Sequence, residues 1–367
     1  MKLLLCFGTR PEAIKMAPVI HELKKQKISY KVCVTAQHRE MLDQVLEFFE
    51  IQPDYDLDLM KAGQSLNGLS ANIFSAIDKV IEEAQPDVVL VHGDTTTASM
   101  IAQAAFHRQI KVGHVEAGLR TYNKSSPFPE EINRQLISRI ADFHFAPTAK
   151  ANSNLLNEQI PKKQIALTGN TVVDALHWAA QKLSGKALTK EIKEIQSLLD
   201  TQKQLVLVTG HRRENFGKGL EEIAEALLEL SSKPHVEIVF PMHLNPNVKG
   251  PVHRILADKL NIHLILPVSY PTMLWLMQRA AVIISDSGGI QEEAPAFGKP
   301  VLVTREFSER MEGVEVGFSV LVGTDKNRII EETNCLLENP PNLSEKENPY
   351  GDGKSAERIV GFLKELQ

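Results

Sequence analysis

The chain has 367 residues, of which 43% are hydrophobic and 24% are charged, and this balance excludes an intrinsically disordered chain. The length predicts about two domains. The formal net charge of −5 argues against nucleic acid or an anionic membrane as a partner. No apolar run approaches the roughly 18 residues of a membrane span. Cys6, Cys33 and Cys335 have neither paired nor metal-type spacing, which predicts a reducing, cytoplasmic location.

Short β-branched runs alternate with helical patterns along the whole chain. Near-continuous apolar strands separated by helices are typical of α/β proteins with parallel sheets that helices cover on both faces. The region 168–203 is charged and has no strand pattern, so it is the expected inter-domain region. Gly351-Asp352-Gly353 interrupts the chain before a final amphipathic helix. The expected strands lie near Leu3–Phe7, Lys31–Thr35, Asp87–Val91, Val112–Val115, Phe143–Ala146, Leu205–Thr209, Val236–Phe240, His263–Leu266, Val282–Ser285 and Val301–Thr304.

The N-terminal residues predict a strand, a turn and a helix that together could bind an anion. Gly8-Thr9-Arg10-Pro11-Glu12 leads into the helix, and proline is well tolerated in a first helical turn. Arg10 and Lys15 add positive charge there, either as ligands of an anion or as solvated surface charges. Pro18 predicts a kink or a break in the helix.

Residues 282–300 predict a second turn of the same kind. Ser285-Asp286-Ser287-Gly288-Gly289 presents backbone N–H groups at a helix N-terminus, where the helix dipole favours an anion. Two adjacent glycines allow a phosphate to approach the backbone closely. Glu292 and Glu293 could accept hydrogen bonds from ribose hydroxyls. The alternative is an ordinary glycine-rich turn followed by solvated glutamates.

Titratable residues follow several predicted strands, at the carboxyl ends where open parallel sheets bind ligands. Asp94 could be functional or could cap the next helix. Glu116, which is followed by Ala-Gly, is harder to explain as a cap, so a functional role is favoured. His211 lies in a cationic run beside a glycine, which indicates a nearby anion, although it could simply contact carbonyl groups. Asp286 belongs to the second turn.

Glu130 and Arg134 are four residues apart on a predicted helix that begins after two prolines. In isolation, a surface ion pair is the simpler interpretation. His92 and His114 lie in or beside strands without paired spacing, so we predict no metal site.

Six motifs occur in order from the first strand towards the final helix, and together they resemble those of the non-hydrolysing bacterial UDP-N-acetylglucosamine 2-epimerases. The resemblance implies a glycosyltransferase-B-type fold, with two Rossmann-like doubly wound parallel-sheet domains and the active site in the cleft between them. It places one domain at 1–170 plus 352–367 and a UDP-binding domain at 171–351. It also implies a homodimer that needs neither NAD nor metal. The motifs are Phe7-Gly8-Thr9-Arg10-Pro11-Glu12-Ala13-Ile14-Lys15, His92-Gly93-Asp94-Thr95-Thr96, Gly113-His114-Val115-Glu116-Ala117-Gly118-Leu119-Arg120, Pro129-Glu130-Glu131, His211-Arg212-Arg213-Glu214-Asn215 and Asp286-Ser287-Gly288-Gly289.

The resemblance also implies roles for individual residues. It leaves open which carboxylate is the acid and which is the base. Met273 stands where many relatives place a Phe against uracil, and Met can also fill an apolar slot. Glu40 and Gly63 depart from the pattern of relatives with a regulatory second substrate site, so substrate-dependent activation is not implied. The catalytic set is Asp94, Glu116, Glu130 and His211, and the substrate-binding set is Arg10, Lys15, Arg134, Met273, Ser287, Gly288, Gly289, Glu293 and Arg310.

The implied reaction is reversible epimerisation at carbon 2 of UDP-N-acetylglucosamine to UDP-N-acetylmannosamine, for cell-surface polysaccharide biosynthesis. The hydrogen on carbon 2 is not next to a carbonyl, so simple deprotonation would be prohibitive. Anti elimination of UDP to 2-acetamidoglucal, followed by re-addition, avoids that step. The alternatives are a retaining glycosyltransferase of the same fold, an epimerase of a related UDP-diacetamido sugar, and a non-catalytic nucleotide-sugar sensor. A sensor would need the anion-binding turns but not the carboxylates.

Overall fold

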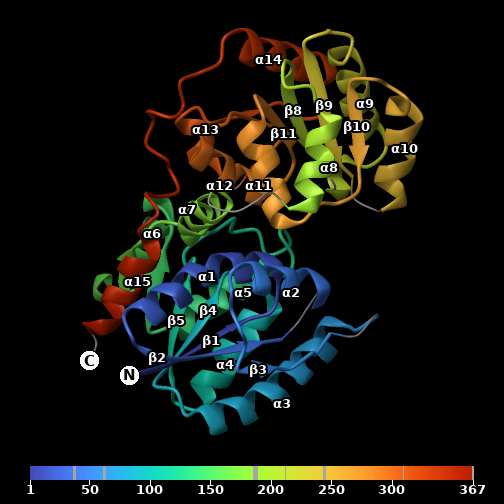
Figure 1. Cartoon of the computed structure of the whole chain (residues 1–367). Helices are drawn as coiled ribbons and strands as arrows, with labels where there is room; N and C mark the ends of the chain where they lie inside the picture. The colour runs from blue at the N-terminus through green and yellow to red at the C-terminus, as the bar shows by residue number, and fades with distance from the viewer. Residues whose placement is uncertain are drawn as a thin grey trace. The chain divides into compact units, whose positions relative to one another are not determined.

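The computed structural model describes residues 1–35, 39–60, 63–184, 189–210, 212–242, 245–308 and 310–365 (Figure 1). The chain forms two compact units, each described separately below. Unit 1 comprises Met1–Trp178 and Tyr350–Gln367, and unit 2 comprises Ala179–Pro349. The sequence predicted the first boundary at 170, directly before helix α7 (Thr171–Ser184), and the division between the units at Trp178 and Ala179 lies inside this helix.

Unit 1 contains, among the described residues, a seven-stranded sheet in the order β3-β2-β1-β4-β5-β6-β7, and its neighbouring strands pair in parallel. The order reverses between β1 and β4, as in doubly wound Rossmann sheets. The strands are β1 (Lys2–Phe7), β2 (Ser29–Val34), β3 (Tyr55–Asp56), β4 (Val88–His92), β5 (Lys111–Val115), β6 (Phe143–Ala146) and β7 (Ile165–Leu167). The remaining helices of unit 1 are α1 (Arg10–Lys25), α2 (Arg39–Phe48), α3 (Leu66–Ala84), α4 (Thr96–His107), α5 (Glu130–Ile140), α6 (Ala149–Asn157) and α15 (Ser355–Lys364).

Unit 2 repeats this plan with a described six-stranded sheet in the order β10-β9-β8-β11-β12-β13, again parallel, with its reversal between β8 and β11. The prediction of two Rossmann-like α/β domains is therefore confirmed. The strands are β8 (Gln204–Thr209), β9 (Val236–Pro241), β10 (Ile262–Ile265), β11 (Val282–Ser285), β12 (Val301–Val303) and β13 (Ser319–Leu321). The helices are α8 (Lys190–Leu198), α9 (Lys218–Leu230), α10 (Pro246–Leu256), α11 (Tyr270–Arg279), α12 (Gly288–Glu293), α13 (Met311–Glu315) and α14 (Lys326–Glu338).

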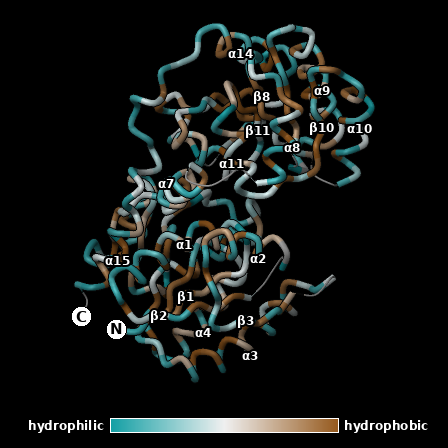
Figure 2. Tube along the Cα trace, in the orientation of Figure 1, coloured by the Kyte–Doolittle hydropathy of each residue, from teal (hydrophilic) through white to brown (hydrophobic). Residues whose placement is uncertain are grey.

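The sequence periodicity explains where the strands lie. All ten predicted strands are present, and the central ones are buried along most of their length because helices cover both faces of each sheet. Figure 2 shows the hydrophobic segments concentrated on strands such as β1 and β8. The prediction missed β3, β7 and β13, which have two or three residues each.

Of the kink or break predicted at Pro18, the break is wrong, because α1 continues from Arg10 to Lys25. A proline inside a helix costs about 3 kcal/mol. Val19, Ile20 and Leu23 are buried on the same helix, and burial of each such side chain contributes about 1.5–3 kcal/mol. Packing against the rest of unit 1 therefore outweighs the missing hydrogen bond.

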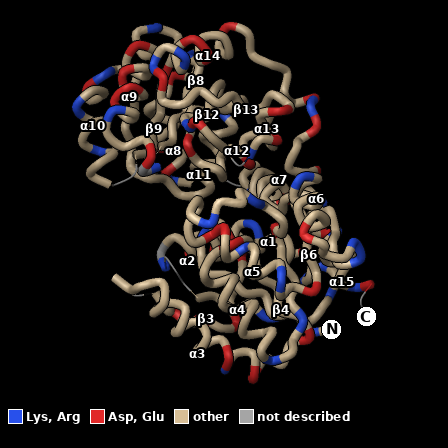
Figure 3. The backbone as a smooth tube through the Cα atoms, turned by 180° about the vertical axis from the view of Figure 1, so that it is seen from behind, with Lys and Arg blue, Asp and Glu red and all other residues tan. Residues whose placement is uncertain are grey.

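The expected inter-domain region carries helices α7 and α8 rather than an irregular linker. The returning segment at the C-terminal end belongs to unit 1, where α15 packs against α1. Helix faces in unit 2 carry interspersed charges of both signs, including the pairs Lys218–Glu222 and Arg254–Glu221 (Figure 3). Among the described residues, no helix is long and apolar enough to cross a membrane.

Candidate active site

The first predicted anion-binding turn is held by a buried carboxylate. Thr9 caps α1, and Glu12 accepts hydrogen bonds from the backbone N–H groups of Gly8 (3.0 Å) and Thr9 (2.7 Å). The same carboxylate accepts a hydrogen bond of 2.7 Å from the hydroxyl of Thr95, in the loop after β4. A Cβ at Gly8 would lie 2.1 Å from Oγ1 of Thr35, so only glycine fits there. Glu12 thus joins the turn after β1 to the loop that carries Asp94.

The two cations predicted in this turn have different surroundings. Arg10 is exposed at the first position of α1. Lys15 is buried, and its ammonium forms an ion pair with Oε2 of Glu116. The same oxygen accepts a hydrogen bond of 3.3 Å from Nδ2 of Asn170 and lies 3.8 Å from Nε2 of His92. Lys15 is therefore not a solvated surface charge.

Glu116 directly follows β5 and has a left-handed backbone conformation, with φ of 65°. This conformation is uncommon for a residue other than glycine and costs on the order of 1–3 kcal/mol unless the surroundings enforce it. Its neighbour Ala117 donates a backbone hydrogen bond of 3.0 Å to Phe145 on β6. The loop is thus anchored to the sheet while the Glu116 carboxylate contacts Lys15.

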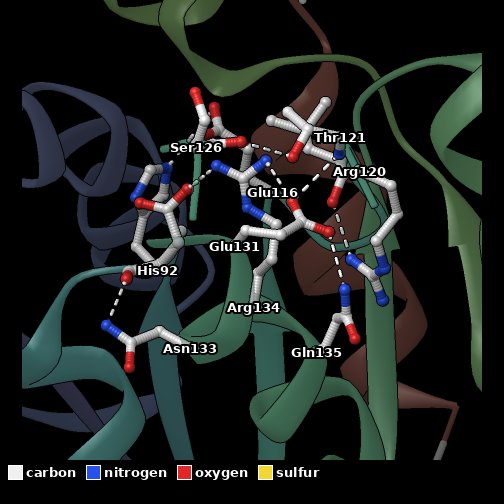
Figure 4. Close-up of polar contacts among 12 residues, drawn as sticks. His92, Glu116, Arg120, Thr121, Ser126, Glu131, Asn133, Arg134 and Gln135 are labelled. Atoms are coloured by element: carbon white, nitrogen blue, oxygen red, sulfur yellow. Dashed lines mark hydrogen bonds and ion pairs between the residues drawn. The ribbon is translucent and has the colours of Figure 1, made fainter. Parts of the chain in front are cut away.

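Asp94 lies at the end of a chain of charged residues in unit 1 that includes Arg134 and Glu131, and these two side chains are labelled in Figure 4. Arg134 forms an ion pair with Asp94 through Nη2, and its Nη1 lies 3.4 Å from Oε2 of Glu131. Asn133 donates a hydrogen bond of 2.9 Å to the backbone carbonyl of Asp94. Glu131 is fully buried and also accepts hydrogen bonds from the backbone of residues 121 and 122 and from Gln135. Helix α5 therefore holds both the side chain and the backbone of Asp94.

The carboxylates near Asp94 change its acidity. Burial raises the pKa of Asp94 above its ordinary value, the charge of Arg134 opposes this rise, and the carboxylates of Glu116 and Glu130 add to it. Glu130 begins α5 and is partly exposed. Three of the four residues expected to be catalytic are thus close enough to act on one another electrostatically.

The structure also decides between the alternatives left open by the sequence. The residue that caps α4 is Thr95, whose hydroxyl accepts from the N–H of Ala98 at 3.0 Å, so Asp94 is not needed as a cap. Arg134 is buried and pairs with Asp94 and Glu131, so it does not form the simple surface ion pair with Glu130 that its spacing indicated.

Buried histidines line the strands behind these carboxylates. Burial lowers the pKa of His92 to about 4 and that of His114 to about 3, so both imidazoles are neutral near pH 7. Nε2 of His114 lies 2.7 Å from the carbonyl oxygen of Gly93. Within the described parts of the chain, no three His, Cys, Asp or Glu side chains form a group that could hold a metal ion.

The second predicted anion-binding turn follows β11 in unit 2. Ser287 precedes α12, and Gly288 and Gly289 form its first turn. The N–H of Ser287 donates to the hydroxyl of Ser285 (3.0 Å), which also lies 2.7 Å from the hydroxyl of Thr209. These contacts join the ends of β8 and β11, at the reversal of strand order where doubly wound sheets bind ligands.

Arg310 lies directly against this turn. A Cβ at Gly288 would be 3.0 Å from Cζ of Arg310, so the guanidinium occupies the space beside the glycine. Nε of Arg310 donates a hydrogen bond of 3.0 Å to Glu292, which is buried. Of the two glutamates that we expected near a ribose, Glu292 is thus paired with Arg310, whereas Glu293 is partly exposed.

Asp286 has a structural role in unit 2, because it holds the loop that follows β8. It is buried, and its carboxylate accepts hydrogen bonds from the N–H of Arg212 (2.8 Å) and from Nδ2 of Asn215 (3.3 Å). Asn215 also donates to the carbonyl of Thr304 at 3.0 Å. These residues line a small cavity at the ends of β8, β11 and β12. Asp286 therefore fixes the loop that follows β8.

Other predicted positions can be located only in part. His211 lies outside the described residues, as does the side chain of Glu40. Gly63 has a φ of 73°, and Met273 lies partly exposed in the first turn of α11.

Sequence reasoning missed three buried residues that organise the site. Asn170 precedes α7 and contacts Glu116, Glu131 holds Arg134, and Glu12 joins two loops. The only sequence signals were a Gly-Asn-Thr run before a helix, a second glutamate after Glu130, and the spacing of a capping box.

Known proteins of one family are similar to this chain along nearly its whole length. A family model described as UDP-N-acetylglucosamine 2-epimerase matches residues 21–364. The chain is 52% identical over 373 residues to the UDP-N-acetylglucosamine 2-epimerase of Yersinia pestis, with 100% of this chain and 99% of that protein covered. The fold is similar to the crystal structure of UDP-GlcNAc 2-epimerase from Neisseria meningitidis bound to UDP-GlcNAc (TM-score 0.93, 49% identity, 100% of both chains covered). It is also similar to the Methanocaldococcus jannaschii UDP-GlcNAc 2-epimerase in complex with UDP-GlcNAc and UDP (TM-score 0.83, 34% identity, 100% of both chains covered). The resemblance seen in the six motifs is therefore confirmed, and the chain belongs to the UDP-N-acetylglucosamine 2-epimerase family.

Proposed function

We propose that this chain catalyses the reversible epimerisation of UDP-N-acetylglucosamine to UDP-N-acetylmannosamine at carbon 2, without a cofactor. The observation that carries this proposal is the group formed by Asp94, Glu116 and Glu130 in unit 1. The pKa of Asp94 is raised by burial and by the other two carboxylates, against the opposing charge of Arg134. A carboxyl group with a raised pKa is suited to donate a proton, and neighbouring carboxylates are suited to accept one.

The proposed chemistry has two stages. In the first, the proton on carbon 2 is removed while UDP leaves carbon 1, which gives 2-acetamidoglucal and UDP. In the second, UDP adds back to carbon 1 and a proton is delivered to the opposite face of carbon 2. Each well-placed acid or base typically contributes a factor of about 10² to 10⁴ in rate. His211 belongs to the proposed catalytic set by family resemblance.

The leaving diphosphate requires stabilisation of its developing charge. In unit 2 we assign this role to Ser287, Gly288 and Gly289, with Arg310 as a cationic contact. The position of Arg310 against Gly288 supports this assignment, because the guanidinium already lies at the turn. Glu293 would bind the ribose, and Met273 would contact the uracil.

In unit 1, Arg10 is the proposed cationic ligand of the nucleotide sugar, because it is exposed at the start of α1. Lys15 and Arg134 are proposed to act near the sugar through the carboxylates that they hold. Their ion pairs with Glu116 and Asp94 support this division of roles.

The oligomer and the location are also proposals. Leu66 (44% exposed) begins α3, Phe106 (60% exposed) lies in the last turn of α4, and these two helices pack side by side. Such exposure supports a homodimer formed through these helices. Sedimentation of the wild-type protein and of Phe106→Asp would test it. Cys6, Cys33 and Cys335 are free thiols, which supports a reducing cytoplasm.

The deciding experiment uses UDP-N-acetylglucosamine alone in heavy water, followed by NMR at carbon 2. The proposal expects deuterium at carbon 2 and the appearance of the second epimer. A glycosyltransferase would need an acceptor, and a sensor would bind without exchange. An epimerase of a diacetamido sugar would act faster on that substrate. Binding without deuterium incorporation would overturn the proposal.

A further inference from the structure

Asn170 is held rigidly by its neighbours in unit 1. The side-chain Oδ1 of Asn170 accepts a hydrogen bond from the backbone N–H of Val172 at 3.0 Å. The backbone N–H of Asn170 donates to the carbonyl of Tyr350 at 2.7 Å. The residue is 4% exposed. Because a backbone donor occupies Oδ1, the NH₂ end of the amide must face the other way.

That NH₂ group faces Glu116. Its distance from Oε2 of Glu116 is 3.3 Å, and this is the same oxygen that pairs with Lys15. The carboxylate is therefore contacted by a cation from α1 and by a neutral donor from the loop between β7 and α7. Glu116 also has a left-handed backbone, so its carboxylate position depends on surrounding contacts rather than on a preferred backbone conformation.

The loop that carries Asn170 is supported by the returning segment of unit 1. Gly169 and Gly351 both have positive φ, and a Cβ at Gly351 would lie 3.3 Å from the Cα of Gly169. This close approach brings the carbonyl of Tyr350 to Asn170. The segment from 350 onwards thus contributes to the site through Asn170, although it follows Glu116 by more than two hundred positions in the sequence.

We propose that Asn170 is a positioning residue for the epimerase reaction: its amide orients the carboxylate of Glu116 towards the reacting sugar. This inference rests on the proposed function of the same site. If the Glu116 carboxylate loses Asn170, one of its two described hydrogen-bond donors, it can rotate. Catalysis is sensitive to displacements of a reacting group by about 1 Å. Asn170 itself need not touch the substrate.

Two substitutions separate positioning from folding. Asn170→Ser keeps an oxygen that can accept from the N–H of Val172, but it is too short to reach Glu116. We expect its turnover to fall by about ten- to a hundredfold, the effect of losing a hydrogen bond to a charged group, while the affinity for UDP changes by less than about twofold. Asn170→Asp keeps the size and the acceptor but replaces the donor with a second carboxylate. We expect it to move an ionisation in the pH profile of kcat to higher pH by about one unit or more.

The matched control is Asp174→Ala. Asp174 accepts the N–H of Ala356 at 2.9 Å and so holds the same returning segment, but it has no contact with Glu116 among the described interactions. This variant should lower the melting temperature and leave the turnover of the folded protein within about twofold of wild type. If Asp174→Ala reduces turnover as much as Asn170→Ser, the role of Asn170 is only to dock that segment, and the inference is wrong.

A readout that does not depend on turnover keeps the two proposals separate. Carboxyl-labelled glutamate, with Glu116→Gln for assignment, allows the titration of Glu116 to be followed by NMR in the free protein. The inference expects the titration midpoint of Glu116 to rise in Asn170→Asp and to change in Asn170→Ser. An unchanged midpoint in both variants would overturn it. Absence of epimerisation by the wild type, with the midpoint still shifted, would count against the proposed function and leave the contact established.

Discussion

Lys15 and Glu116 form a buried ion pair although they are 101 positions apart in the sequence. Lys15 comes from the second turn of α1, and Glu116 comes from the loop that follows β5. A lysine and a glutamate that are both removed from water stabilise each other only in a precise geometry, and loss of one partner leaves an uncompensated charge. The pair therefore links the first anion-binding turn to a carboxylate of the proposed catalytic group.

Substitution of either central carboxylate should affect chemistry more than binding. We expect Glu116→Gln and Asp94→Asn each to reduce turnover at least about a hundredfold, because each removes one acid or base from the reaction. The affinity for UDP, measured by calorimetry, should stay within a few fold, since the proposed diphosphate ligands lie in unit 2. Near-normal turnover in either variant would reduce that residue to an orienting role.

Glu131 should act on Asp94 through Arg134. Both carboxylate oxygens of Glu131 accept hydrogen bonds. In Glu131→Gln an NH₂ group replaces one of these oxygens and faces a donor that it cannot pair with. We therefore expect a loss of about 1–3 kcal/mol in the free energy of unfolding. We also expect a fall of about tenfold in turnover, because Arg134 loses one of its two anionic partners. The control is Gln135→Ala, which removes a neutral donor to Glu131 and leaves the charged chain intact. Equal turnover of the two variants would contradict this prediction.

The glycine beside Arg310 should be required for UDP binding. A methyl group at residue 288 would press on the guanidinium, so Gly288→Ala should weaken UDP binding about tenfold, as expected when a charge-assisted hydrogen bond is displaced. Gly361→Ala is the control, because a Cβ there would meet open space inside α15. It should stabilise the protein by about 0.5–1 kcal/mol and leave UDP affinity unchanged. Calorimetry with UDP tests both variants, and tight binding by Gly288→Ala would remove Arg310 from the proposed site.

Three buried histidines should make the protein sensitive to mild acid. Burial lowers the pKa of His92 to about 4, of His114 to about 3 and of His144 to about 4. An unfolded histidine titrates near 6.5, so the unfolded chain binds more protons between about pH 6.5 and 4. The stabilising contribution of the neutral imidazoles is therefore complete above pH 6.5 and is lost as the pH falls towards 4.

The slope should steepen below pH 6.5 and approach a limit of about 1.4 kcal/mol per pH unit for each histidine, or about 4 kcal/mol per pH unit for the three together, near pH 5. Urea unfolding at pH 7, 6 and 5 would measure it. His144→Gln should lower this limiting slope by the contribution of one histidine, about 1.4 kcal/mol per pH unit. Stability that does not change between pH 7 and 5 would mean that the imidazoles are protonated in the folded state.

Activity should not depend on NAD or on a divalent ion. In the proposed mechanism, elimination and re-addition of UDP replace a redox step, and Arg10 and Arg310 supply positive charge for the diphosphate. Protein freed of nucleotides and treated with a chelator should keep its rate of deuterium incorporation at carbon 2. Restoration of a lost activity by added NAD or magnesium would refute the cofactor-free reaction.

The sequence by itself determined the fold class, ten of the thirteen described strands and the positions of the candidate residues at strand ends. These features are local: β-branched runs form strands, glycine and proline end them, and parallel strands bring their carboxyl ends to one edge of a sheet. The motifs also carried enough information to predict the family. Strands of two or three residues such as β3, β7 and β13 escaped because pairing with a neighbouring strand, rather than local pattern, makes them strands.

Only the tertiary structure decided which charges meet. The spacing of Glu130 and Arg134 predicted a pair on α5, but Arg134 pairs with Asp94 and Glu131. Its Nη2 and Nη1 groups then each face a carboxylate, and burial favours such pairing of a charged side chain. Likewise Asn170 reaches Glu116 only because the returning segment at Tyr350 holds its loop. The contacts of Arg134 with Asp94 and of Asn170 with Glu116 join elements far apart in the chain, and no local pattern in the sequence specifies them.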